Sequence, residues 1–263
     1  MNATSTIAPS LFISHGAPTF AIEAGELGDK LGQLGQALKA IRAIVVVSPH
    51  WETPDLRVSS NEAPATIHDF FGFPRELYAI EYPARGSAEV ADLVVTALES
   101  AGLQPNLDSG QDMDHGVWVP LRYLRPEADI PVVCVSLPLD ATPASALQIG
   151  QALAPLRERG MLILGTGSMT HNLGEFRGAT TSAVQPYVLE FAGWIRDQIQ
   201  ARNAESLLQY RALAPHAVRA HPSEEHLLPL FVALGASTDA DHFAVISHEV
   251  RYGMLSMESY YWH

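Results

Sequence analysis

The fold is indicated most clearly by one stretch of the chain, Ile44-Val45-Val46-Val47-Ser48-Pro49-His50-Trp51. An isoleucine and three valines without a polar residue between them are typical of a strand that is buried on both faces of an α/β sheet. Pro49 is expected to end this strand, because proline cannot donate to the sheet and restricts the residue before it. His50 would then lie at the strand's carboxyl end, the edge at which open α/β sheets bind ligands. Taken alone, His50 would simply cap the strand with a hydrogen bond.

The composition excludes several classes of protein. The 263 residues are 47% hydrophobic and 17% charged, so they can bury a large core in one domain or in two close-packed domains. The formal net charge is -13 and no run of Lys or Arg occurs, which argues against a nucleic-acid or anionic-membrane partner. No apolar run approaches the ~18 residues of a membrane span. The lone Cys134 lies in an apolar run, as expected of a core residue in a reducing compartment, and we expect a cytoplasmic protein.

Strands and helices are predicted to alternate along the chain. Apolar periodicity and capping residues predict helices at 27–41, 87–100, 142–159, 184–200 and 204–213, and a further helix that starts with Pro222. Short apolar runs predict strands at 11–14, 44–47, 56–60, 130–137, 161–165, 243–247 and 254–257. This alternation predicts an α/β fold, with three α/β/α layers around a central, mostly parallel (mixed) sheet.

Several histidines are predicted to meet at one edge of this sheet. His15, His50 and His171 each follow a predicted strand, and His115 is expected in a turn. Neutral imidazoles that converge suit a divalent transition metal, whereas crowded imidazolium charges repel one another. The spacing adds little, because no His-Glu-x-x-His helix, Cys-x-x-Cys pair or glycine-rich nucleotide loop occurs. The remaining histidines outside the motifs below are expected to make surface or core hydrogen bonds: His216, His221, His242, His248 and His263.

Six motifs, in order over nearly the whole chain, resemble those of the LigB-type class III extradiol ring-cleaving dioxygenases, and most closely those of the 4,5-DOPA extradiol dioxygenase branch. They are Ser14-His15-Gly16-Ala17-Pro18, Ser48-Pro49-His50-Trp51, Thr66-Ile67-His68-Asp69-Phe70, Asp114-His115-Gly116-x-Trp118, His171-Asn172-Leu173 and Glu225-His226-x-x-Pro229-Leu230. The resemblance implies a single catalytic domain over residues 1–263. Such an enzyme uses non-haem Fe(II) to open a catechol ring beside its two hydroxyls, and adds both atoms of O2 to the product.

The resemblance also assigns roles to five histidines. His15, His50 and His226 would hold the metal. His171 would be the acid/base residue, near enough to serve as a fourth ligand when the site is empty, and His115 would be a second histidine close to the substrate. The unperturbed pKa of histidine lies near neutral pH, which suits His171 for taking a proton from a catechol and returning it. We expect His115 to orient or protonate the reacting oxygen.

The segment 65–74 is expected to cover the substrate ring. It carries His68, Phe70 and Phe71 and is too apolar to be left in water, so we expect it to fold over another part of the molecule. Phe70 and Phe71 are predicted to contact the substrate. His68 is assigned equally to substrate contact or to packing of the lid. A carboxylate on the substrate would need a cationic partner, and the candidates are Arg75, Arg85 and Arg177.

Three alternatives stay open at this point. Glu225 could replace His226 as the third ligand, since more distant relatives use two histidines and a glutamate, but on a helix it would point about 100° away from His226. Zn(II) could occupy the site, because imidazole sites accept several metals and zinc binds more tightly than Fe(II). The chain could accordingly be a zinc-dependent hydrolase, or a non-catalytic metal-binding or interaction protein on the same scaffold. The sequence does not indicate an oligomeric state.

Overall fold

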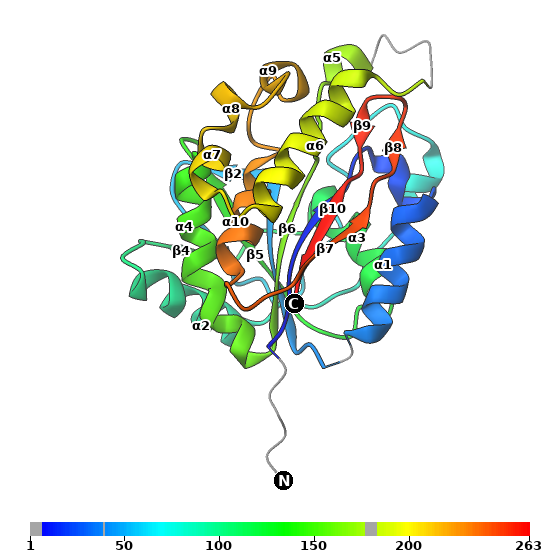
Figure 1. Cartoon of the computed structure of the whole chain (residues 1–263). Coiled ribbons are helices and arrows are strands. Elements are labelled where there is room, and N and C mark those ends of the chain that lie inside the picture. The colour runs from blue at the N-terminus through cyan, green and yellow to red at the C-terminus, as the bar shows by residue number, and fades with distance from the viewer. Residues whose placement is uncertain (1–6, 39, 177–182) are drawn as a thin grey trace.

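A computed structural model of the chain describes residues 7–38, 40–176 and 183–263. Within these ranges the strands are β1 (Ser10–Ser14), β2 (Ala43–Thr53), β3 (Arg57–Ser59), β4 (Asn106–Asp108), β5 (Val132–Pro138), β6 (Met161–Gly167), β7 (Phe243–Ser247), β8 (Val250–Arg251), β9 (Leu255–Ser256) and β10 (Ser259–Trp262). The α-helices are α1 (Gly25–Ala37), α2 (Ala88–Ser100), α3 (His115–Leu124), α4 (Pro143–Leu153), α5 (Leu173–Phe176), α6 (Pro186–Gln200), α7 (Ala204–Leu208), α8 (Tyr210–Leu213), α9 (Ala217–Ala220) and α10 (Leu228–Ala236) (Figure 1). Short 3-10 helices are η1 (Pro18–Ala21), η2 (Arg75–Ala79) and η3 (Ala154–Arg159).

One mixed sheet organises the described part of the chain. Its eight strands lie in the order β4-β3-β5-β2-β6-β1-β10-β7. The neighbours β5/β2, β2/β6 and β6/β1 are parallel, as are β3 and β4, whereas β3/β5, β1/β10 and β10/β7 are antiparallel. The predicted mostly parallel, mixed sheet is therefore confirmed. The carboxyl ends of β1, β2 and β6 meet at a single edge.

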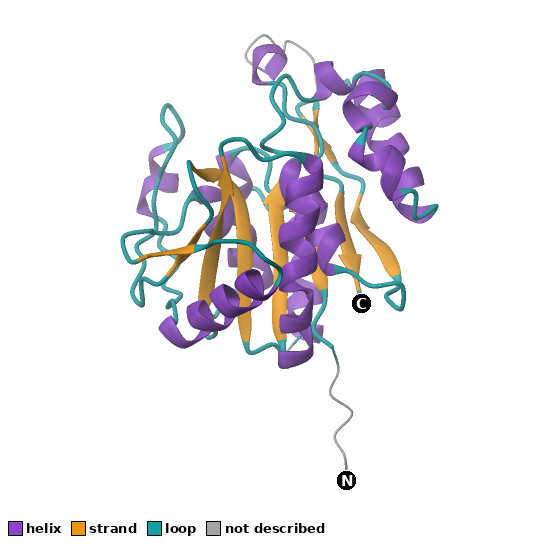
Figure 2. Cartoon of the chain, turned by 90° about the vertical axis from the view of Figure 1, so that its left-hand side faces the viewer, coloured by secondary structure: helices purple, strands orange, loops and turns teal. Residues whose placement is uncertain are grey.

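Helices cover both faces of the sheet (Figure 2). Along β2, Val45 and Val47 pack into a core cluster with side chains of α2, α4, α6 and α10. The alternate residues Ile44 and Val46 pack into a second cluster with α1 and α3. This alternation follows from the two-residue period of a strand, and the absence of polar residues from both series explains why both faces are buried. The predicted α/β/α layering is confirmed.

Pro49 does not end its strand, contrary to the expectation. β2 continues through Pro49 and His50 to Thr53. Instead, the pairing of β2 with β6 stops at Val47, and its register with β5 shifts between Val47 and Glu52. Proline is tolerated where the hydrogen-bond ladder is already interrupted, so it marks an irregularity here rather than a terminus. His50 lies within this irregular stretch.

The prediction of a helix that starts at Pro222 is also wrong. The chain forms turns and bends up to His226, and α10 begins only at Leu228. Pro229 gives the reason. Proline lacks an N–H and its ring clashes with the carbonyl four residues earlier, so a helix that began at Pro222 could not run through Pro229. His226 and Glu225 consequently lie in a turn, and the helical angle between them does not apply.

Other boundaries differ from the predictions in smaller ways. The predicted helix 142–159 is α4 followed by η3, and the predicted helix 204–213 is broken into α7 and α8 at Gln209. The predicted strand 254–257 is shortened to β9, which forms a hairpin with β8. β10 was not predicted as a strand. His115 is the first residue of α3 rather than part of a turn.

Two further expectations concern single features of the chain. Cys134 is buried in β5, as expected of a core residue, and burial raises the pKa of its thiol above the ordinary value. Among the residues with described positions, no helix combines the length and the apolar character needed to cross a membrane. Arg177 lies outside the described residues.

Candidate active site

The predicted site residues come together at the carboxyl edge of the sheet. His15 directly follows β1, His50 lies near the end of β2, and His171 stands four residues beyond β6. His226 reaches the same place from the turn before α10, because its backbone oxygen accepts a hydrogen bond of 2.9 Å from Ser168 N–H. A Cβ on Gly167 would overlap that oxygen, so only glycine allows this close approach.

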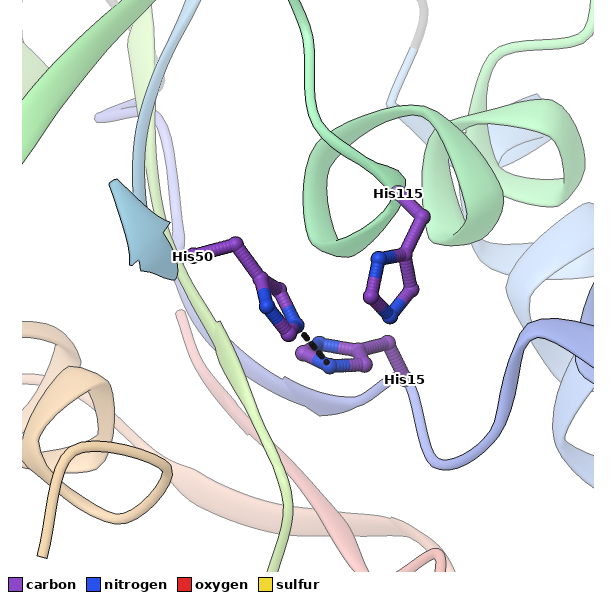
Figure 3. Close-up of side chains that lie close together, drawn as sticks. All are labelled: His15, His50 and His115. Carbon is purple, nitrogen blue, oxygen red and sulfur yellow. Dashed lines mark hydrogen bonds between the residues drawn. The ribbon is translucent and has the colours of Figure 1, made fainter. Parts of the chain in front are cut away.

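His15 and His50 face each other directly. Their Nε2 atoms lie 3.2 Å apart, as the dashed line in Figure 3 marks. The other nitrogen of His15, Nδ1, is 2.9 Å from the hydroxyl of Thr166, and this hydroxyl donates its proton to the backbone oxygen of Gly116 at 2.7 Å. Thr166 must therefore accept from His15 Nδ1–H. In the neutral ring, the lone pair of His15 is left on Nε2, where it faces His50.

His226 presents its lone pair in the same way. Its Nδ1 lies 2.9 Å from Oε1 of Glu225, a carboxylate that can only accept, so Nδ1 carries the proton. Its Nε2 is buried and has no hydrogen-bond partner in the structure. The ring centroid of His226 lies 5.7 Å from that of His15 and 5.0 Å from that of His50. A buried nitrogen without a partner is costly, and a metal ion between the three rings would satisfy it.

His115 borders the same space from α3. Its ring centroid is 4.0 Å from that of His50 and 5.3 Å from that of His15, and the three rings converge in Figure 3. Asp69 accepts hydrogen bonds from both the backbone N–H and Nδ1 of His115. Nε2 of His115 is therefore the atom left to face the centre.

His171 stacks on His226. Their ring centroids are 3.5 Å apart and the planes differ by only 11°. The lone pairs of two nearly parallel rings run side by side and do not point at one atom. This arrangement suits His171 to proton transfer better than to sharing an ion with His226.

Two groups of metal-ligating atoms can be distinguished by distance. The nitrogens of His15, His50 and His115 lie within 4.8 Å of one another, and so do the ligating atoms of His171, Glu225 and His226. The predicted triad of His15, His50 and His226 spans the two groups. The buried, unpartnered Nε2 of His226 favours that triad, whereas Glu225 is already bound to Nδ1 of His226.

Burial keeps four of these histidines neutral, namely His15, His50, His171 and His226. It lowers the pKa of His15 and His226 well below the ordinary value, and the charges of neighbouring histidines lower it further. Burial likewise lowers the pKa of His50 to about 3 and that of His171 to about 4. Burial lowers these pKa values by desolvation, which disfavours the charged form of a base. Neutral rings with free lone pairs are the form in which histidine binds a metal.

Three carboxylates add negative charge around the histidines. The hydrogen bond and charge of His115 hold the pKa of Asp69 down, at about 2, against the opposing effect of burial. Glu225 acts electrostatically on His50 and His171. Partial burial and then the charge of Glu225 raise the pKa of Glu52. The site thus combines four buried, neutral imidazoles with an acidic rim.

The segment 65–74 is fixed to the body of the protein. Ile67 N–H donates to Met113 O at 2.8 Å, and Trp118 Nε1–H donates to Ile67 O at 2.8 Å. The ring of Phe70 is buried against His115, with centroids 5.6 Å apart. Phe71, by contrast, is 89% exposed, so the expectation that this loop shields all its apolar residues holds only in part. The contact of Phe71 with the substrate stays a prediction.

His68 lies among aromatic residues rather than among the metal-ligating histidines. Its Nε2 is 3.0 Å from the backbone oxygen of Ile80, and its ring is within 6.0 Å of Phe70, Tyr78 and Trp118. These contacts favour lid packing over substrate contact.

Arg75 and Arg85 are the two candidate cationic partners that lie within the described residues. The backbone oxygen of Arg85 accepts from Val132 N–H at the start of β5, which is the opposite end of that strand. Arg75 is exposed in η2. A cavity of about 660 Å³ opens beside Phe243 and Trp262, and its lining includes His242 but none of the five histidines of the site, His15, His50, His115, His171 and His226.

Three residues of the site were not predicted as partners of the histidines, namely Asp69, Thr166 and Glu225. Asp69 lies inside a quoted motif, and Glu225 was considered only as a ligand. The position of Thr166 in β6, level with Ile13 of β1, is what brings its hydroxyl near His15. That relationship depends on strand register, which the local sequence does not reveal.

An α/β/α sheet whose carboxyl edge gathers neutral, converging histidines defines a metal-dependent enzyme of the α/β class. Residues 9–261 match the family model described as the catalytic LigB subunit of aromatic ring-opening dioxygenase, and the chain belongs to this family. It is an extradiol ring-cleaving dioxygenase, as predicted, and acts on an aromatic substrate with O2. The family is non-haem and metal-dependent, and the histidine group described above can hold an ion.

Similar proteins support this assignment along almost the full length. A protein of Beta vulgaris named 4,5-DOPA dioxygenase extradiol is 36% identical over 99% of this chain and 98% of its own. One of the same name from Escherichia coli K12 is 33% identical over 97% of this chain and 95% of its own. The crystal structure of an uncharacterized protein from Escherichia coli K12 superposes with a TM-score of 0.76 at 28% identity, covering 97% of this chain and 99% of that one.

Proposed function

We propose that residues 1–263 form a single catalytic domain that uses Fe(II) and O2 to open a catechol with a DOPA-like side chain. The observation that carries this proposal is the convergence of three imidazole rings: Nε2 of His15 and Nε2 of His50 lie 3.2 Å apart, and the ring of His226, whose buried Nε2 has no partner among the described residues, lies with its centroid 5.0 Å from that of His50. The names of the relatives support the DOPA-like substrate. Zn(II) would bind the same nitrogens, because imidazole accepts both metals.

His15, His50 and His226 are the residues that would hold the ion. Fe(II) held by these residues would supply redox chemistry with O2 and act as a Lewis acid toward the catechol oxygens. Thr166 and Glu225 hold the far nitrogens of His15 and His226, and so keep the lone pairs turned inward. The three rings come from β1, β2 and the turn before α10, whose positions the sheet fixes.

His171 is the proposed acid/base residue. Burial lowers its pKa to about 4, so the ring is neutral near pH 7 and can accept a proton from a catechol hydroxyl. The proton returns to the product once the ring has opened. His115, held by Asp69, would orient the reacting oxygen through Nε2, and Phe70 would exclude water beside it.

Anaerobic loading with Fe(II), followed by a panel of catechols in air-saturated buffer, tests this function. We expect O2 uptake together with a coloured ring-opened product. The same protein loaded with Zn(II) should consume no O2, and His171→Gln should keep its iron but lose most of the activity. Full iron occupancy without O2 uptake on any catechol would contradict the proposal. Turnover of an ester without O2 would favour the hydrolase.

A further inference from the structure

Glu225 lies beside the proposed metal ligands, and only one of its two carboxylate oxygens accepts a side-chain hydrogen bond from a described residue. Oε1 accepts from His226 Nδ1 at 2.9 Å and from Ser223 Oγ at 3.0 Å. The second oxygen, Oε2, accepts no side-chain hydrogen bond from any described residue, and the side chain is 21% exposed. It adjoins the site in which Nε2 of His226 is buried without a partner, which independently marks the place where a ligand is bound.

Glu52 extends the same negative charge along β2. It lies two residues beyond His50, about 7 Å further along the strand, at the end of the stretch in which the register with β5 shifts. Trp51 between them is buried in the core cluster that also contains Ile44 and Val46, whereas Glu52 is exposed. The charges of Glu52 and Glu225 are close enough to interact.

The neighbouring Glu224 is arranged quite differently. Its Oε1 accepts from Tyr210 Oη at 3.0 Å and lies 3.6 Å from Arg211 Nε, so its charge is paired on the outer side of the turn. Across the described ranges, no Lys or Arg forms an ion pair with Glu52 or Glu225. Of the two adjacent glutamates, Glu224 is thus neutralised by Arg211, whereas the charge of Glu225 is not paired with a described Lys or Arg.

We propose that Glu52 and Glu225 select catechols whose side chain carries a protonated amine over catechols whose side chain ends in a carboxylate. The proposal rests on the catechol chemistry proposed above and names the substrate class within it. A unit charge at about 7 Å from a carboxylate in partly exposed surroundings changes affinity by roughly tenfold after screening. The net charge of -13 acts in the same direction by attracting cationic substrates.

Three catechols test this selection, each with a substituent at the same ring position that begins with two saturated carbons: 4-(2-aminoethyl)catechol, 4-ethylcatechol and 3-(3,4-dihydroxyphenyl)propionate. With the iron-loaded enzyme, we expect kcat/KM to fall about tenfold at each step from the cationic to the neutral to the anionic compound. Glu52→Gln and Glu225→Gln should each reduce the cation-to-anion ratio by about tenfold, and Glu52→Lys should reverse it. Glu224→Gln is the matched control and should leave the ratio unchanged.

Binding without turnover separates this proposal from the proposed function. The dissociation constants of the three compounds are measured by calorimetry on zinc-loaded protein under argon, and the same order is expected. If no catechol supports O2 uptake by the iron-loaded enzyme, the proposed function has failed, and the order of the dissociation constants still decides the selectivity. Equal affinity for the cationic and anionic compounds would overturn the proposal. So would a ratio that is unaffected by Glu52→Gln and Glu225→Gln.

Discussion

Asp69 accepts two hydrogen bonds from His115, one from the backbone N–H to Oδ1 and one from Nδ1 to Oδ2, each 2.9 Å long. One carboxylate therefore caps the first turn of α3 and fixes the tautomer of its first residue. Oδ2 also lies 3.7 Å from Nδ1 of His50. The loop that carries Phe70 is thereby tied to the histidines that it borders.

Replacing Asp69 should impair catalysis more than metal binding. In Asp69→Asn, the side-chain amide can no longer accept from both donors of His115, so His115 loses its fixed orientation. We expect kcat/KM to fall about tenfold to a hundredfold, while the metal content stays near that of the wild type. Steady-state kinetics over a range of pH and metal analysis measure the two effects. Unchanged kcat/KM would show that Asp69 serves only the helix.

Thr166 should control the metal affinity through His15. Thr166→Val removes the acceptor of Nδ1–H but keeps the shape of the side chain, so the lone pair of Nε2 is no longer fixed toward His50. We expect the metal affinity to fall about tenfold to a hundredfold, as measured by competition with a chelator. Thr166→Ser retains the hydroxyl and should bind almost as tightly as the wild type. Equal affinities of the Val and Ser variants would argue against this role.

The third ligand can be identified by comparing three variants. We expect His226→Ala to lose the metal, His115→Ala to retain it, and Glu225→Gln to weaken binding by about tenfold, because Glu225 acts through His226. Metal-to-protein ratios after dialysis against a weak chelator provide the measurement. Full occupancy in His226→Ala, together with its loss in Glu225→Ala, would assign the ligand role to Glu225 instead.

Gly167 should be intolerant of any side chain. A Cβ there would overlap the backbone oxygen of His226, so Gly167→Ala must displace the turn that carries this histidine. We expect a loss of about 1–3 kcal/mol in the free energy of unfolding and weaker metal binding. Gly193→Ala is the control, because α6 is helical there and the nearest atom would be 3.6 Å away. The free energy of unfolding of that variant, measured by chemical denaturation, should rise by up to about 1 kcal/mol. Similar stability of the two variants would contradict the packing argument.

Acid should destabilise the metal-free protein, in part through His221. This ring is fully buried, donates from Nε2 to Met169 O at 2.9 Å, and has a pKa lowered to about 4 by burial. In the unfolded chain His221 binds a proton near pH 6.5, and in the folded chain only near pH 4. Its neutral form therefore contributes fully to the free energy of unfolding above pH 6.5, and this contribution falls as the pH is lowered. At pH 5 the loss is about 2 kcal/mol. His221→Gln should therefore lose about 2 kcal/mol less than the wild type between pH 8 and pH 5 in urea denaturation. An equal loss in both proteins would exclude His221.

The fold could be predicted largely because the central strands are short and uniformly apolar. Residues 44–47 and 161–165 permit few other structures, and the histidines that follow such strands must meet when the strands are parallel neighbours. Pro222 shows the limit of local signals. It fits the first position of a helix, but Pro229 further along forbids that helix, and the two residues have to be weighed together. His226 was nevertheless placed at the site, from its motif alone.

The partners of the histidines could not be predicted, because they depend on register and on loop positions. Thr166 reaches His15 only because β6 and β1 pair in one particular register. Asp69 reaches His115 across 46 positions of sequence. β10 was missed since a strand of four residues between loops has little signal of its own, and its antiparallel pairing with β1 stabilises it.

The first strand of the chain lies in the interior of the sheet, between β6 and the last strand, β10. During synthesis on the ribosome, β1 has to wait for about 150 further residues before β6 can pair with it, and for about 250 before β10 can pair with its other edge. Assembly is therefore governed by distant pairings, which form slowly. A polypeptide that ends before residue 226 lacks His226 as well as β7 and β10, which form one edge of the sheet. Such a chain should aggregate readily and should not bind the metal ion.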